Sequence, residues 1–245
     1  MRVVTNEALI RRNRNLAQIS FFVAIGGLVF SFLMSNRLAG QGSDSAFTFN
    51  CLIVPILFGV VIFSVRMANH WVREPLPWTS LQEAVRGVTN QGVLYHFIFP
   101  ARHVLIIPQG VYILFPLFHD RPIVVKDDKW RIPGGMATAL IGFMRQENLG
   151  NPPRDAQAEA TQLQKYLDKH LPDSGVTVNP LIVFIHPNAR AVLEGEQSVP
   201  VVFAKTKDKT ERTSLQDYLK DQKEAGHVSL SQTQIEELNE TLIYA

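Results

Sequence analysis

Two long uncharged apolar runs in the N-terminal third constrain this chain most. They cover residues 16–34 and 47–65, and neither contains Lys, Arg, Asp or Glu. At about 1.5 Å of rise per residue, a helix over either run spans roughly 28 Å, close to the hydrocarbon thickness of a bilayer. A cleaved signal peptide is the alternative for the first run, and a buried core helix is the alternative for the second. The length of both runs favours a transmembrane helical hairpin.

Arginines on the flanks predict how this hairpin is oriented. The connecting residues 35–46 hold one arginine and one aspartate, whereas the outer flanks are basic. The flanking arginines are Arg2, Arg11, Arg12, Arg14, Arg66 and Arg73. Because cytoplasmic flanks carry the excess of Lys and Arg, we expect both termini in the cytoplasm and a multi-pass protein of the cell membrane.

Charge is distributed unevenly along the chain. Residues 1–67 hold six Lys and Arg against two Asp and Glu, and the remaining residues hold 18 against 20. Non-specific binding to nucleic acid depends on Lys and Arg that neutralise phosphates, so a nucleic-acid partner is not expected for the slightly acidic part. The single cysteine, Cys51, lies in an apolar run, so the chain has no internal disulfide framework.

The composition divides the chain into four parts. We expect a cytoplasmic segment over 1–15, the hairpin over 16–67, a membrane-proximal linker over 68–78 and a cytoplasmic domain over 79–245. Tryptophans and prolines in the linker suit the lipid headgroup layer and stiffen the exit from the membrane.

The last part has the pattern of an α/β domain with a mixed β-sheet flanked by helices. Apolar runs separated by turn residues are typical of buried strands, and residues 155–171 have the spacing of an amphipathic helix. The expected strands are 103–107, 111–117, 123–125, 181–185, 190–193 and 199–204. The expected helices are 79–97, 136–145, 155–171 and two C-terminal ones that begin after the capping residues Ser214 and Ser231.

Three short motifs carry a resemblance to a known family. They are the turn Pro108-Gln109-Gly110-Val111, the pair Asn151-Pro152 and the strand Leu181-Ile182-Val183-Phe184. Over roughly residues 80–220 the chain resembles the nuclease-related domain (NERD) family, a branch of the restriction-endonuclease-like nucleases. The resemblance implies a restriction-endonuclease-like fold. Members of this class hold divalent cations with carboxylates and use a lysine beside the attacking water.

The side chains that the family uses for catalysis are missing from the matching positions. The carboxylate at the start of the first central strand corresponds to Arg102 or His103, and the Glu-x-Lys of the second strand corresponds to Phe115 and Leu117. A family Gln on the following helix corresponds to Asp155. The resemblance therefore implies an inactive site that holds no metal and no cofactor.

Two other groups of side chains are candidate sites. A relocated metal site is conceivable from carboxylates near the predicted sheet, although aspartates between strands are more often solvated turn residues. These carboxylates are Glu83, Asp120, Asp127 and Asp128. A basic segment could contact phosphates or lipid headgroups, although interspersed acids favour an ordinary solvated face. Its residues are Lys205, Lys207, Lys209 and Arg212.

The predicted membrane hairpin, together with the missing catalytic side chains, favours a binding or scaffolding module rather than an enzyme. Its expected partners are the lipid bilayer and the proteins of a membrane assembly, in which it would be an accessory subunit. The alternative is a membrane-tethered, metal-dependent nuclease with relocated catalytic residues. Fold by itself does not decide between these two functions.

Overall fold

The structure is a computed structural model, and it describes residues 1–40, 43–135, 142, 149–172, 175–205, 213–226 and 230–244, without the side chains of 43 and 241–244. It divides into two compact units. The sheet unit contains Met1–Asn6, Pro77–Gly134 and Leu149–Ala245, and the other unit contains the helical hairpin within Glu7–Leu76. The predicted helix over 136–145 lies outside the described residues, except for position 142.

A six-stranded mixed sheet forms the centre of the sheet unit, in the order β1-β2-β3-β4-β7-β9. The β2-β3 and β3-β4 pairs are antiparallel, whereas β1-β2, β4-β7 and β7-β9 are parallel. The strands are β1 (Arg2–Thr5), β2 (Val93–His96), β3 (His103–Ile107), β4 (Gly110–Leu117), β7 (Val178–Phe184) and β9 (Val201–Phe203). The central strands β3, β4 and β7 confirm the predicted ones, because buried runs rich in Val, Ile and Leu fit the middle of a sheet.

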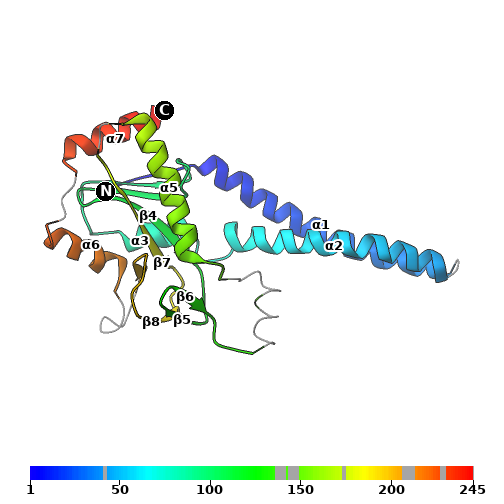
Figure 1. The fold of residues 1–245 in the computed structure, drawn as a ribbon. Helices are drawn as coiled ribbons and strands as arrows, with labels where there is room; N and C mark the ends of the chain where they lie inside the picture. Colours follow the sequence, from blue (N-terminus) through cyan, green and yellow to red (C-terminus); the bar gives the residue numbers. More distant parts are fainter. Residues whose placement is uncertain are drawn as a thin grey trace. The chain divides into compact units, whose positions relative to one another are not determined.

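Helices cover both faces of this sheet (Figure 1). The helices α3 (Pro77–Ala84) and α6 (Leu215–Glu224) pack on one face, and α5 (Pro152–His170) and α7 (Gln232–Tyr244) pack on the other. The predicted α/β class, with a mixed sheet flanked by helices, is therefore confirmed.

Side-chain caps fix where these helices begin. Asn151 accepts a hydrogen bond from the backbone N–H of Arg154, and Ser214 accepts one from that of Asp217. Ser231 caps α7 in the same way by accepting from Gln234. Because the first N–H groups of a helix have no partner inside it, such caps set its boundary from local sequence.

A smaller sheet has the order β6-β5-β8 and packs near the ends of β7 and β9. Its strands are β5 (Pro122–Lys126), β6 (Lys129–Arg131) and β8 (Arg190–Glu194). Asp127 and Asp128 form the turn between β5 and β6, with φ of 48° and 60°. Two positive φ values are what a two-residue hairpin turn of this kind requires, and Asp tolerates them better than most residues.

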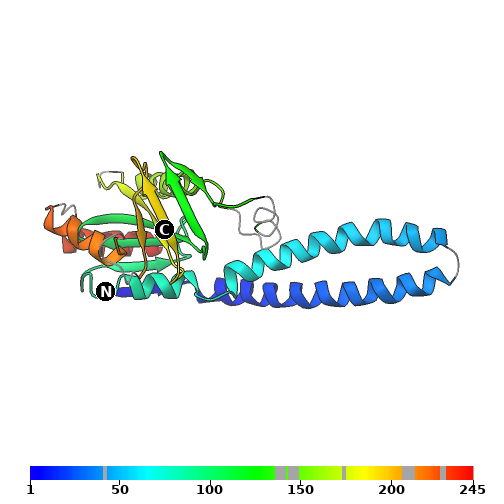
Figure 2. The same cartoon turned by 90° about the horizontal axis from the view of Figure 1, so that it is seen from below.

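Both predicted apolar runs are helical and lie within longer helices, α1 (Glu7–Ala39) and α2 (Ser43–Trp71). The two helices run side by side and antiparallel in both views (Figure 1 and Figure 2). A Cβ at Gly27 would lie 2.5 Å from Leu57 Cδ2, so glycine permits the close approach. Asn50 Nδ2 donates to Ser35 Oγ across the pair at 2.9 Å.

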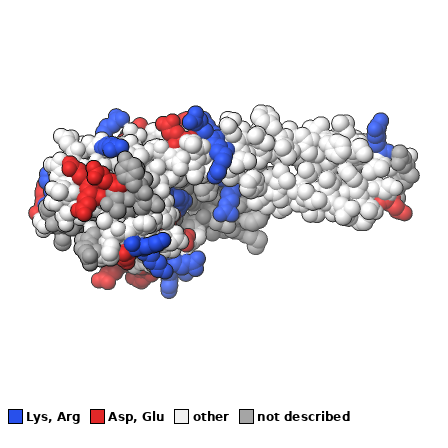
Figure 3. All heavy atoms as spheres, turned by 90° about the horizontal axis from the view of Figure 1, so that it is seen from above, with Lys and Arg blue, Asp and Glu red and all other residues white. Residues whose placement is uncertain are grey.

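The surface of this hairpin is apolar. Phe22 is 70% exposed and Leu52 is 67% exposed, so α2 is not the buried core helix considered as the alternative for the second run. Figure 3 shows a long band without Lys, Arg, Asp or Glu along the helices, with charged side chains at its ends. Exposed apolar surface of this extent is unfavourable in water, which indicates an association with a membrane.

Two features of the fold differ from the prediction. The helix expected over residues 79–97 is wrong beyond Ala84, because Gly87 and Gly92 have φ of 82° and 136° and residues Val93–His96 form β2. The residues of β1, at the beginning of the chain, join the sheet as an edge strand and were not predicted as a strand. The chain therefore begins in the sheet unit, passes through the hairpin and returns to the sheet unit.

Candidate functional site

Arg102 and Phe115, which the sequence resemblance aligns with catalytic residues of the nuclease-related domain family, lie together. The Arg102 guanidinium carbon is 5.0 Å from the centre of the Phe115 ring. Arg102 Nε and Nη2 also contact Glu159 Oε1 on α5, at 2.8 and 2.6 Å. The backbone N–H of Arg102 donates to Glu159 Oε2 at 3.3 Å. The Arg102 guanidinium therefore has a carboxylate partner, Glu159, and an aromatic neighbour, Phe115.

Strand alternation explains why Arg102, rather than His103, lies beside Phe115. Successive side chains of a strand point to opposite faces of the sheet. Val111 and Ile113 of β4 pack with α5, and Phe115 follows them on the same face. Leu117 lies on that face as well and packs with Ile182 and other apolar side chains. Phe115 and Leu117 of β4 are therefore half-buried and pack against apolar side chains.

His103 lies on the opposite face and forms a buried pair with His96 of β2. Their Nδ1 atoms are 2.8 Å apart, and each residue is about 1% exposed. Burial lowers the pKa of His96 to about 4. Burial, followed by the proximity of His96 and Arg102, lowers the pKa of His103 well below its usual range. Both rings are neutral at physiological pH, so one Nδ1 donates a hydrogen bond and the other accepts it.

We call Arg102, Phe115 and Glu159 the Arg102 cluster. Within the described residues, Asp155 forms no ion pair with Arg102. It lies in the first turn of α5 and contacts Arg154 at 3.7 Å, and its side chain is 47% exposed. Glu159, one helical turn later, makes the contact instead. Glu159 was not predicted from the sequence. It lies beside Ala156 and Ala160 at the edge of the buried face of α5, which is the signal that could have identified it.

The four carboxylates of the relocated-site alternative are not brought into one cluster. Glu83 forms an ion pair with Lys205, and this contact lowers the pKa of the Glu83 carboxyl. Asp127 and Asp128 lie in the β5-β6 turn, where Asp128 accepts from the backbone N–H of Ser198. Within the described residues, no three His, Cys, Asp or Glu side chains are placed to hold a metal ion.

The basic segment is described only at its first member. Lys205 pairs with Glu83, which reduces its availability for a phosphate. Lys207, Lys209 and Arg212 lie outside the described residues. The prediction that this segment contacts phosphates or lipid headgroups therefore stays a prediction.

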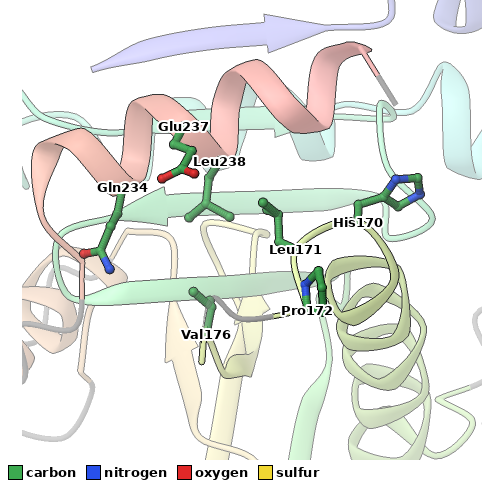
Figure 4. A pocket seen from close by; sticks show the side chains of 7 residues that line it. All are labelled: His170, Leu171, Pro172, Val176, Gln234, Glu237 and Leu238. Atoms are coloured by element: carbon green, nitrogen blue, oxygen red, sulfur yellow. The ribbon is translucent and has the colours of Figure 1, made fainter.

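Two cavities of the sheet unit lie apart from the Arg102 cluster. One, of about 330 Å³, lies between the end of α5 and α7 (Figure 4). Its lining is His170, Leu171, Pro172, Val176, Gln234, Glu237 and Leu238. The other, of about 640 Å³, is lined by neutral side chains that include Gln109, Tyr112 and Tyr218. Neither lining offers the two carboxylates that magnesium needs as a minimum.

Within the described residues, Arg102, Phe115 and Glu159 offer an aromatic ring and a guanidinium that is paired with a carboxylate. A guanidinium keeps its proton at physiological pH and repels a divalent cation. The one carboxylate in the cluster, Glu159, is already engaged by two guanidinium nitrogens. Comparison of the chain with protein-family models, with curated proteins and with solved structures found no match.

Proposed function

We propose that this protein is a membrane-anchored binding or scaffolding module with a catalytically inactive nuclease-related domain, and that it serves as an accessory subunit of a membrane protein assembly. The observation that carries the proposal is the arginine at the position of a family carboxylate. Arg102 contacts Phe115 and Glu159 there. Its positive charge takes the place in which a nuclease of this family would hold its cation.

The proposed restriction-endonuclease-like fold rests on the arrangement around this position. An antiparallel pair, β3 and β4, is followed through α5 by the parallel strand β7. This order agrees with the resemblance of the sequence to the nuclease-related domain family. In that alignment the positions of Glu and Lys are half-buried Phe115 and Leu117, which offer no ligand and no charge.

The proposed anchoring rests on α1 and α2 and on the course of the chain. Strand β1 precedes the hairpin, the other strands follow it, and all belong to the sheet unit. Both ends of the hairpin must therefore lie on the same side of a membrane that it crosses. The arginine-rich flanks assign that side to the cytoplasm.

A restored site tests the proposal. In the variant Arg102→Asp/Phe115→Glu/Leu117→Lys, two new carboxylates would lie near Glu159. Manganese should raise the Tm of this variant, because a ligand stabilises the fold that binds it. The wild-type protein should show no such rise and no metal-dependent cleavage of DNA or RNA. The matched control is Arg102→Asn/Phe115→Gln/Leu117→Met, which has similar side-chain volumes without the charges and should not respond to manganese.

The competing function is a tethered nuclease with relocated ligands. One observation favours keeping it: Asp120 Oδ1 is buried and has no hydrogen-bond partner among the described residues. Magnesium-dependent cleavage by the wild-type protein that is lost on Asp120→Ala, Asp127→Ala or Glu83→Ala would establish the enzyme and refute the scaffold. Cleavage that survives all three changes would point to a contaminating nuclease.

A further inference from the structure

Strand β8 leaves one edge of the smaller sheet open. It pairs with β5 on one side, and within the described residues no strand pairs with its other side. Two of its apolar side chains are exposed, Val192 by 54% and Leu193 by 42%. An open strand edge with apolar side chains is a template for pairing with another strand. Proteins normally protect such an edge, so its exposure needs an explanation.

The contact with β5 shows which backbone N–H and C=O groups of β8 are already paired and which face outward. The carbonyl of Glu194 accepts from the backbone N–H of Asp127, on the β5 side. The N–H and C=O of alternate residues point to the same neighbour, so those of Val192 also face β5. The backbone groups of Ala191 and Leu193 therefore face outward and are the ones available to a new strand.

The sequence of β8, Arg-Ala-Val-Leu-Glu, is complementary to itself in the antiparallel direction. With a twofold axis at Val192, Ala191 of each copy lies opposite Leu193 of the other, and these residues exchange hydrogen bonds. Arg190 then lies opposite Glu194 of the second copy, on the same face as Val192. Neither Arg190 nor Glu194 has a side-chain ion pair within the described residues, although Lys126 is the neighbour of Glu194 on β5.

We infer that β8 is a self-association surface, through which two copies of this chain join their smaller sheets into one continuous antiparallel sheet. Charge complementarity fixes the register, because any shift by two residues would remove both Arg-Glu pairs. The occupant of the open edge is thus a second copy of the same strand, related by a twofold axis.

The small area of this contact makes the dimer depend on the membrane. A single short strand on each side buries less area than the roughly 1,200 Å² of a stable soluble interface. Two chains confined to one membrane meet at a higher effective concentration, which strengthens a weak contact. This step rests on the proposed anchoring. Pairing should therefore be strong in the membrane and weak in dilute detergent.

Disulfide cross-linking in membranes tests the inference with the full chain. In a Cys51→Ala background, Val192→Cys places two thiols opposite each other at a non-hydrogen-bonded pair, about 4.5 Å between Cα atoms, within the range that a disulfide spans. Mild oxidation should give a covalent dimer. The matched control is Arg131→Cys, which is also exposed but lies on β6, at the opposite edge of the same sheet. It should remain monomeric.

Charge reversal then tests the register. Added to Val192→Cys, Arg190→Glu should reduce the cross-linked fraction about fivefold, because like charges then lie opposite each other. Glu194→Arg should do the same, and the two changes together should restore the dimer. Absence of the Val192→Cys dimer in membranes, or indifference to both reversals, would overturn the inference. These outcomes do not depend on metal binding or cleavage, so they are separate from the test of the proposed function.

Discussion

Arg102 and Glu159 are coupled through both oxygens of one carboxylate. The Arg102 side chain is 39% exposed, whereas that of Glu159 is 16% exposed, so the carboxylate is the more protected partner. Hydrogen bonds between charged groups are stronger than neutral ones when water has limited access. The pair joins the entry of β3 to α5 and adds to the apolar packing that holds α5 on the sheet.

The variant Glu159→Gln should destabilise the sheet unit, because it leaves the guanidinium with a neutral acceptor. We expect a loss of about 1 kcal/mol and a fall in Tm of roughly 2–4 °C. Differential scanning fluorimetry of the protein in detergent measures this change. Glu196→Gln is the control, since Glu196 is exposed and has no ion pair within the described residues. Equal effects of the two variants would mean that the Arg102 pair contributes no stability.

The buried pair His96-His103 should make stability depend on pH. Because burial lowers the pKa of His96 to about 4, the unfolded chain binds more protons than the folded one between about pH 6.5 and pH 4. Stability is therefore full above pH 6.5 and is lost as the pH falls, by about 3 kcal/mol for His96. Thermal unfolding measured from pH 7.5 to pH 4.5 should show a falling Tm.

A variant without the titrating group identifies the source of this dependence. His96→Met should make the pH profile less steep in that window, whatever its effect on stability at pH 7.5, while His103, whose pKa burial also lowers, keeps its own contribution. His170→Met is the control, because His170 lies at the end of α5 outside the pair. A His96→Met profile as steep as that of the wild type would assign the pH dependence to other groups.

At the scale of elements, β1 is the part of the sheet unit that is separated from the rest by the hairpin. It pairs with the whole length of β2, from Arg2 opposite Val93 to Thr5 opposite His96. The backbone N–H of Asn6 extends this contact by donating to the carbonyl of His96. Removal of β1 exposes the backbone edge of β2.

A soluble form of the sheet unit should therefore need its first residues. We expect a chain of residues 77–245 to be less stable and more prone to aggregate than one in which residues 1–6 are joined to residue 77 by a Gly-Ser linker of about a dozen residues. Size-exclusion chromatography and urea unfolding compare the two forms. Equal stability and solubility would show that β1 contributes little to the fold.

At the scale of the whole molecule, the hairpin should cross a membrane with both of its ends on the same side. In a Cys51→Ala background, a cysteine introduced by Ser43→Cys at the beginning of α2 should react with an impermeant thiol reagent in intact cells. A cysteine introduced by Glu196→Cys in the sheet unit should react only after the membrane is opened. The reverse pattern would place the sheet unit outside the cell.

Several parts of this protein follow from local sequence patterns alone. Apolar runs without charge define α1 and α2, and the capping residues Ser214 and Ser231 set where α6 and α7 begin, because these signals act within a few residues. Buried strands such as β4 and β7 have continuous apolar sequences for the same reason. The resemblance of the sequence to the nuclease-related domain family also aligned Phe115 and Leu117 with its Glu and Lys, and this alignment stays a prediction.

Contacts between residues far apart in the chain could not be predicted, because they depend on how the elements pack. Strand β1 has four residues, too few for a pattern, and it forms because β2 offers a partner edge about 90 positions later. The sequence left open whether Arg102 or His103 matches the family carboxylate. The alternation of side chains along the chain entering β3 places Arg102 beside α5 and His103 beside His96. Glu159 contacts Arg102 because α5 packs over the sheet at this point. Such a contact stabilises the protein only after both elements have folded, so no local pattern in the sequence indicates it.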